Sequence, residues 1–144
     1  MTRTFSGGDD GNLLRGFRGR SLLQGATIEG MERETMPLSA AVLEAAAEYG
    51  QRLRSRFGEE VAAIRLFGSY ARGEAHEESD VDIAVVLDSV DWATRREVID
   101  LATEVGLERE LHLSPTLFDR TTFELWRRQE RALVVDILRE GVQV

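Results

Sequence analysis

The chain has 144 residues, which is enough for one domain with a real hydrophobic core and too few for two well-built ones. It contains no cysteine, so disulfides, thiol catalysis and zinc–thiolate sites are excluded, and two histidines are too few for a histidine-rich metal site. The formal net charge is −8 and every cationic residue is an arginine, which excludes lysine-dependent chemistry such as the phosphate-binding P-loop. Because affinity for nucleic acid depends on neutralising phosphates, the acidic balance predicts no direct nucleic-acid binding.

Residues 1–35 are glycine-rich and show no sustained helical or strand period. They predict a disordered or dispensable extension, with translation from Met31 or Met36 as a related possibility, and residues 36–144 form the predicted domain. An arginine–glycine arm that binds nucleic acid is the alternative for this extension. No stretch approaches the roughly 18 apolar residues of a membrane span, and the start lacks the apolar core of a secretory signal. We therefore expect a cytoplasmic protein with no membrane contact.

From Pro37 onward the pattern becomes regular. Ser39 is the predicted N-cap of a helix that ends at Gly58. Trp92 is predicted on the apolar side of a later helix, and Thr121 or Thr122 is predicted to cap the last one. The elements after Gly58 are expected as a strand at 61–67, a brief helix at 70–72, a strand at 81–87, a helix at about 91–105, a strand at 111–118 bent at Pro115, and a helix from about 123 to 140. This alternation predicts an α/β domain with a small mixed sheet of three to four strands flanked by helices.

Two short motifs stand at the ends of the first two predicted strands. Gly68-Ser69 follows the first strand, and glycine there permits a sharp turn and the close approach of a phosphate. Ser69 offers a hydroxyl beside main-chain amides that favour negative charge. Arg72 lies one helical turn further on. Two predictions for it are equally supported: it contacts a triphosphate, or it pairs with an acidic residue of the following loop.

Asp80-Val81-Asp82 opens the second strand. Alternate residues of a strand face the same side, so the two carboxylates lie together with Cα atoms roughly 6–7 Å apart. Hard carboxylate oxygens suit Mg²⁺, and two of them can bridge cations that activate an attacking oxygen and hold leaving phosphates. Each motif alone is weak, whereas their joint spacing on two strands favours attack of a hydroxyl on an α-phosphate.

The two motifs resemble the signature of the minimal nucleotidyltransferases, within the DNA polymerase β-like superfamily. The likeness runs from Leu66 to Gly73, through Ser79 to Val85, and over roughly residues 38–144. It implies the polymerase-β-like nucleotidyltransferase fold, contact of Gly68 and Ser69 with nucleotide phosphates, Mg²⁺ on Asp80 and Asp82, and ATP as substrate. It also implies a HEPN-type ribonuclease toxin as partner in a hetero-oligomer, because family members often serve as antitoxins and some transfer AMP to a toxin tyrosine.

One departure from the family concerns a third carboxylate, which the superfamily usually carries on the next strand. This chain has Leu111-His112-Leu113-Ser114 there. Strand alternation predicts Glu110, His112 and Ser114 on one face, so His112 takes the equivalent position and Glu110 is the nearest acid. A neutral histidine can accept a proton from an attacking hydroxyl. The alternative is a packed strand residue with no chemical role.

Three functions follow from these patterns. The first is a Mg²⁺-dependent nucleotidyltransferase that moves AMP from ATP to a hydroxyl of a partner protein, since the chain has no room for a separate substrate domain. The second is a catalytically weak or silent antitoxin that acts by binding its toxin, for which the missing third acid argues. The third is a nucleotidyltransferase for an antibiotic or another small hydroxyl compound.

Overall fold

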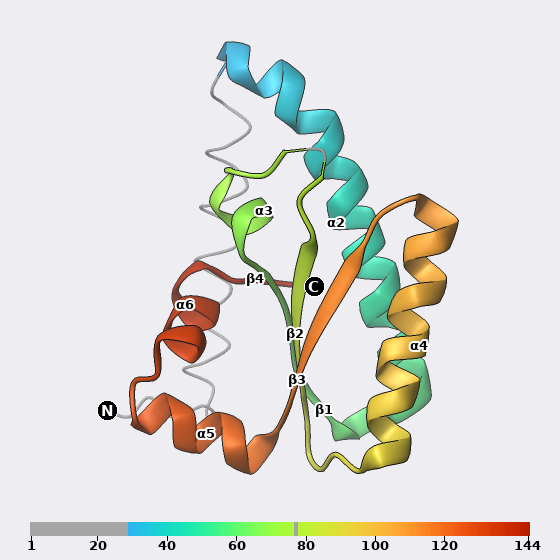
Figure 1. Cartoon of the computed structure of the whole chain (residues 1–144), viewed down its shortest axis with the longest axis vertical. Helices are drawn as coiled ribbons and strands as arrows, with labels where there is room; N and C mark the ends of the chain where they lie inside the picture. Colours follow the sequence, from blue (N-terminus) through green and yellow to red (C-terminus); the bar gives the residue numbers. More distant parts are fainter. Residues whose placement is uncertain (1–28, 77) are drawn as a thin grey trace.

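The computed structural model places helices on both faces of one central sheet (Figure 1). The structure describes residues 29–76 and 78–144. The elements in chain order are α2 (Glu29–Phe57), the 3₁₀ helix η1 (Gly58–Glu60), β1 (Val61–Phe67), α3 (Ser69–Arg72), β2 (Val81–Leu87), α4 (Trp92–Arg109), β3 (Leu113–Asp119), α5 (Arg120–Arg128), α6 (Ala132–Glu140) and β4 (Val142–Gln143).

Within residues 29–76 and 78–144 the sheet has four strands, in the order β3-β2-β1-β4. Strand β1 runs antiparallel to both β2 and β4, whereas β2 and β3 are parallel. A parallel pair needs a crossover connection, and α4 supplies it. The predicted fold class, a mixed sheet of three to four strands flanked by helices, is confirmed.

Alternation along the strands divides the core between the two faces of the sheet. Helices α2 and α4 cover one face, and α5 and α6 cover the other (Figure 1). On β2 the odd-numbered residues face α2 and α4, while the even-numbered ones face the other way. The first cluster includes Ile64, Leu66, Val81, Ile83, Val85, Leu87, Val98 and Val105. The second includes Phe67, Ala84, Val86, Phe118, Phe123, Val134 and Ile137.

The predicted strands at 61–67 and 81–87 are confirmed, while the third begins at Leu113 instead of residue 111. Strand β3 passes through Pro115 without interruption because it lies at the edge of the sheet. The Val81 N–H donates to the His112 carbonyl, 2.8 Å away, so main-chain groups of even-numbered residues point toward β2. Pro115 is odd-numbered, so its missing N–H falls on the unpaired side of β3, where no ladder bond is lost.

The predicted start of the first helix is corrected. Helix α2 begins at Glu29, so Ser39 is not its N-cap; the predicted domain boundary at residue 36 lies within this helix and stays a prediction. The reason is local propensity, since Glu, Arg and Met are good helix formers and recur just before Pro37. The rest of the predicted extension, residues 1–28, lies outside the described residues, and its disorder stays a prediction.

The prediction of a single C-terminal helix, and of the residue that caps it, is also corrected. The Asp119 carboxylate accepts the Thr122 N–H at 2.6 Å, so Asp119 is the N-cap of α5, and neither Thr121 nor Thr122 is. The single predicted helix is two, separated between Arg128 and Ala132. Trp92 is 74% exposed, against the prediction of a core position, because it is the first residue of α4 and precedes the buried stretch of that helix.

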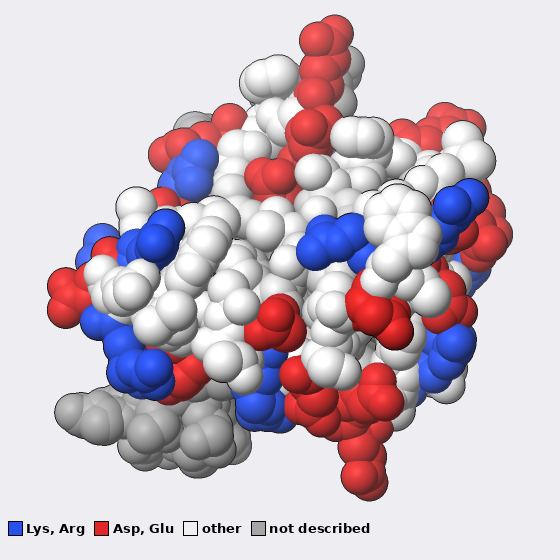
Figure 2. Space-filling view, turned by 60° about the horizontal axis from the view of Figure 1, so that its bottom comes forward, with Lys and Arg blue, Asp and Glu red and all other residues white. Residues whose placement is uncertain are grey.

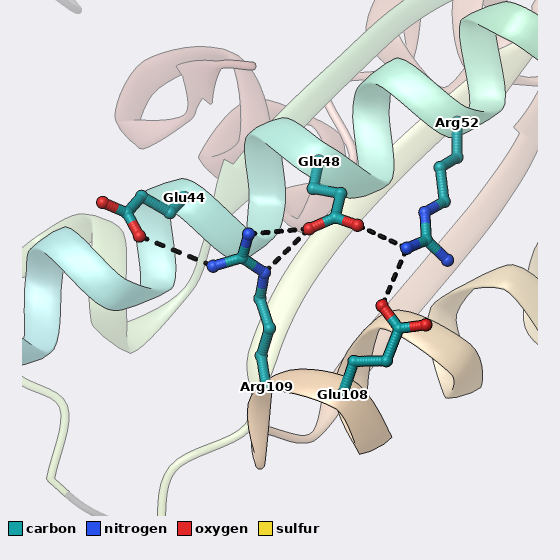
Figure 3. Close-up of polar contacts among 5 residues, drawn as sticks. All are labelled: Glu44, Glu48, Arg52, Glu108 and Arg109. Atoms are coloured by element: carbon teal, nitrogen blue, oxygen red, sulfur yellow. Dashed lines mark hydrogen bonds and ion pairs between the residues drawn. The ribbon is translucent and has the colours of Figure 1, made fainter.

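A ladder of ion pairs fastens α4 to α2 at the surface (Figure 3). Glu48 lies at its centre, 2.7 Å from Arg109 through Oε1 and paired with Arg52 through Oε2. Arg52 also lies 2.7 Å from Glu108, and Arg109 lies 3.5 Å from Glu44. Hydrogen bonds from Arg109 and then from Arg52 lower the pKa of Glu48 below its usual value of 4.5. The ladder therefore holds the crossover helix that positions β3 beside β2.

The lowered pKa of Glu48 gives a pH-dependent prediction. A carboxyl group with a depressed folded-state pKa stabilises the fold above its usual pKa of 4.5, and that contribution is lost as the pH falls below this value. We expect Glu48→Gln to lower the melting temperature at pH 7, and the difference from wild type to shrink steadily between pH 4.5 and pH 3. Thermal melts followed by circular dichroism measure this. A difference that is the same at both ends of the range contradicts it, and Glu59→Gln, an exposed residue outside the ladder, is the control.

Candidate active site

The turn after β1 is built so that only glycine fits at residue 68. Gly68 has φ 82° and ψ −155°, a main-chain conformation that L-residues rarely adopt. A Cβ atom placed there would lie 2.2 Å from Oδ2 of Asp82, far inside van der Waals contact. The Gly68 main chain and the Asp82 carboxylate therefore lie directly against each other, although 14 positions separate them in sequence.

Asp82 lies on the face of the sheet opposite α2 and α4. Val81 and Ile83 are fully buried against those helices, and this directs the intervening Asp82 to the other side, while Asp80 directly precedes the strand. Burial raises the pKa of Asp82, and the nearby charge of Asp80 raises it further, while Arg72 opposes the shift. The carboxylates are thus close enough to repel one another, which is the electrostatic condition that a bound cation relieves.

Asp80 also contacts His112, which precedes β3. Asp80 Oδ1 lies 2.8 Å from Nδ1 of His112, and the side chains are 55% and 74% exposed respectively. A carboxylate accepts at that distance, so Nδ1 carries the proton, and in the neutral imidazole the lone pair is then on Nε2. His112 therefore contacts one of the two carboxylates, Asp80, and its place in the active site and its chemical role stay predictions.

Glu110 does not share the position predicted for it. It is the C-cap residue of α4 with φ 58° and ψ 42°, so it precedes β3 and strand alternation does not apply to it.

The register partner of Asp82 on β3 is Ser114. Leu113 and Leu117 pack toward α2 and α4, which turns Ser114 to the face that carries Asp82. No role was predicted for Ser114 from the sequence, although strand alternation had already placed it on the same face as His112.

Arg72 pairs with two acidic residues in this structure, and its contact with a triphosphate stays a prediction. Its Nε donates to Glu74, in the following loop, at 2.9 Å, and its Nη1 lies 3.3 Å from Glu140 at the end of α6. The Glu140 partner could not be read from local sequence because the two residues are 68 positions apart. Ser69 begins α3, is partly exposed, and accepts the Glu74 N–H at its carbonyl, 2.9 Å away.

Among the described residues no group of three or more His, Cys, Asp or Glu side chains is arranged to hold a metal ion. Two carboxylates nevertheless fit Mg²⁺ in a nucleotide-dependent site, because this ion keeps several waters and takes its other oxygens from substrate phosphates. The raised pKa of Asp82 fits the same reading, since a cation would compensate the charge that burial penalises. The donor set is therefore compatible with a metal that binds together with a triphosphate.

The comparison with protein families decides the class of this site. The family model described as "Nucleotidyltransferase domain" matches residues 47–141, which include both motifs. The chain belongs to the nucleotidyltransferase family. The predicted resemblance is confirmed at this level, and the enzyme class that it implied, nucleotidyltransferase, is confirmed with it.

Curated relatives of this nucleotidyltransferase carry related names. "Putative protein adenylyltransferase MJ0141" of Methanocaldococcus jannaschii is 27% identical over 81 residues, which are 56% of this chain and 82% of the relative. MJ0604 of the same organism, with the same description, is 46% identical over 61 residues, or 42% and 57% of the two chains. "Protein adenylyltransferase MntA" of Thermococcus cleftensis is 58% identical over 38 residues, 26% of this chain and 36% of the relative. The chain thus spans 82% of the first relative, 57% of the second and 36% of the third.

A solved structure described as a toxin–antitoxin with AMP-PNP aligns with a TM-score of 0.45 and 28% identity, over 67% of this chain and 69% of the other. In the part of the nucleotidyltransferase that the structure describes, none of the helices is long and apolar enough to cross a membrane.

Proposed function

We propose that this nucleotidyltransferase transfers AMP from ATP, with Mg²⁺, to a hydroxyl group of a partner protein. The observation that carries the proposal is the direct contact between the Asp82 carboxylate and the Gly68 turn, with Asp80 beside it. The contact brings the two motifs to one place, because Phe67, directly before the turn, is the register partner of Asp82 in the antiparallel pair of β1 and β2. The relatives named protein adenylyltransferases support AMP and a protein acceptor.

The proposed reaction needs phosphates at the glycine turn and a cation at the carboxylates. Gly68 leaves room for a phosphate to approach the main chain, and Ser69 offers a hydroxyl beside it. Asp80 and Asp82 would hold Mg²⁺, which when bound neutralises charge on the triphosphate and on the leaving pyrophosphate. The acceptor oxygen attacks the α-phosphorus, a new P–O bond forms, and the bond to pyrophosphate breaks. His112 Nε2, with Nδ1 engaged by Asp80, is a candidate acceptor for the hydroxyl proton.

The exposure of the site supports a macromolecular acceptor. The side chains of Asp80 and His112 are more than half exposed, whereas sites for small molecules bury most of the ligand surface. We further propose a HEPN-type toxin as the acceptor, in a hetero-oligomer formed in the cytoplasm, because the minimal nucleotidyltransferases that this chain resembles often act as antitoxins. A second polypeptide would then complete the walls of the site.

The test is transfer of label from ATP labelled in its α-phosphate to the partner protein, with and without Mg²⁺. We expect transfer by wild type and none by Asp80→Ala/Asp82→Ala, because the double variant removes both metal-binding carboxylates. Equal labelling by the two proteins, or none by wild type, contradicts the proposal. Asp88→Ala, at the far end of β2, is the matched control and should label the partner at the wild-type rate.

A second function, an antitoxin that acts by binding alone, is favoured by one observation. Oδ1 of Asp80 is already hydrogen-bonded to His112, and no third carboxylate stands in β3 beside it. If Asp80→Ala/Asp82→Ala still relieves toxicity in cells, binding is sufficient. If the double variant forms the complex and no longer protects, the chemistry is required.

A further inference from the structure

Helix α4 carries an exposed apolar stripe that no described element covers. Trp92 and Leu107, near its two ends, are 74% and 76% exposed, and Ile99 in its middle is 47% exposed. With 3.6 residues per turn, these three side chains fall within about 80° of arc, together with Arg96 and Thr103. The opposite side of α4, with Val98 and Val105, is buried against α2 and the sheet. The exposed stripe therefore takes no part in the packing of α4 against α2 and the sheet.

Charge is distributed unevenly along the same stripe. Its first half carries Arg95 and Arg96, and its second half carries Asp100 and Glu104, while Glu97 and Glu108 of the same helix are paired with Arg56 and Arg52 of α2. Among the described residues neither arginine of the first half nor Asp100 forms an ion pair, and Glu104 has only a 3.6 Å contact with Arg52. From the end where α4 begins, acidic and basic side chains are both spread over the surface around an uncharged area, and neither sign dominates (Figure 2). A surface that is basic at one end and acidic at the other complements itself when it is reversed.

We propose that this face of α4 binds a second copy of the same chain, with the two helices antiparallel about a two-fold axis near Ile99. In this arrangement Trp92 of one copy lies over Leu107 of the other, because the two residues are nearly equidistant from Ile99 in sequence. Arg96 of one copy falls between Asp100 and Glu104 of the other. In an isologous contact of this kind every pair of residues occurs twice, once on each side of the axis. The apolar pairs and the ion pairs therefore form at the same time.

The size of the contact sets the expected strength. Helix α4 has 18 residues and is about 27 Å long, so one helix pair buries less than the roughly 800 Å² per partner of a standard interface. We therefore expect a weak dimer. Two chains joined through α4 would keep the Asp82 carboxylate free, because it lies on the face of the sheet opposite α4.

Sedimentation of the full chain over about 5–500 µM measures the association. We expect a concentration-dependent dimer for wild type and a monomer for Ile99→Arg, because the two introduced charges would face each other near the axis. Leu125→Arg is the matched control, since Leu125 is an exposed leucine on α5, at 41%, outside this face. A wild type that stays monomeric throughout, or a dimer unaffected by Ile99→Arg, overturns the inference. Circular dichroism confirms that each variant is folded.

A charge exchange and a cross-link test the orientation. Arg96→Asp and Asp100→Arg should each weaken the dimer at least about 5-fold, and the double variant should restore it, because opposite charges again face each other. The chain has no cysteine, so Ile99→Cys introduces one thiol, which should form an intermolecular disulfide on mild oxidation, while Leu125→Cys should not. Failure of the double variant to recover affinity, or equal cross-linking of both cysteine variants, contradicts the antiparallel arrangement.

Discussion

Asp82→Asn is expected to lower the rate of AMP transfer by at least about 10²-fold while leaving the protein folded. The side chain keeps its shape against Gly68, so the loss reports the missing negative charge and not a disturbed turn. Initial rates with labelled ATP measure the effect. Asp88→Asn makes the same chemical change at the opposite end of β2 and should remain within about twofold of wild type. Comparable rates for wild type and Asp82→Asn would exclude a role for this carboxylate.

The same substitution should also make the protein more stable at neutral pH. Burial and Asp80 raise the pKa of Asp82 above its usual 3.8, so ionisation costs the folded state stability once the pH exceeds this value. Asparagine carries no charge and removes that cost. We expect a higher melting temperature than wild type at pH 7 and convergence of the two as the pH falls toward 3.8 and below. A gain in stability with a loss of activity distinguishes a functional carboxylate from a structural one.

Gly68→Ala is expected to lower the free energy of unfolding by about 2–4 kcal/mol and to abolish transfer. Two costs combine, namely the main-chain conformation at φ 82°, ψ −155° and the collision of the new methyl group with the Asp82 carboxylate. Urea denaturation followed by fluorescence measures the loss. Gly73→Ala is the control, because Gly73 has φ 77° and ψ 20° and a methyl group placed on it would meet no atom of the described residues within 4 Å, so its cost should be only about 1–2 kcal/mol.

The collision can be separated from the main-chain strain by a double-mutant cycle. Asp82→Ala shortens the side chain that a methyl group at residue 68 would strike. We expect the two changes together to cost less than the sum of the single changes by about 0.5–2 kcal/mol. If the changes in unfolding free energy of the two single variants add exactly, the Gly68 turn and the Asp82 side chain are not in contact. That result would contradict the contact on which the proposed function rests.

Local patterns in the sequence were sufficient for β1, β2 and the fold class, while β3 begins two residues later than predicted and β4 was not predicted. Apolar runs bounded by glycine and polar residues marked β1 and β2 to the residue, because buried strands need continuous apolar side chains and end where these stop. The helix boundaries were less accurate. Ser39, Thr121 and Thr122 all have side chains that can cap a helix, and which polar residue does so depends on where the chain turns, as it does at Asp119.

The sequence by itself predicted two carboxylates on one face near a glycine turn, because strand periodicity and glycine's freedom at positive φ are local properties. Tertiary structure decided what those groups touch. The contacts of Gly68 with Asp82, Asp80 with His112 and Arg72 with Glu140 join separate elements, and their geometry depends on strand order and register. The exposure of Trp92 and the exclusion of Glu110 from β3 have the same origin, since burial and strand ends are set by packing between elements and not by the pattern within one.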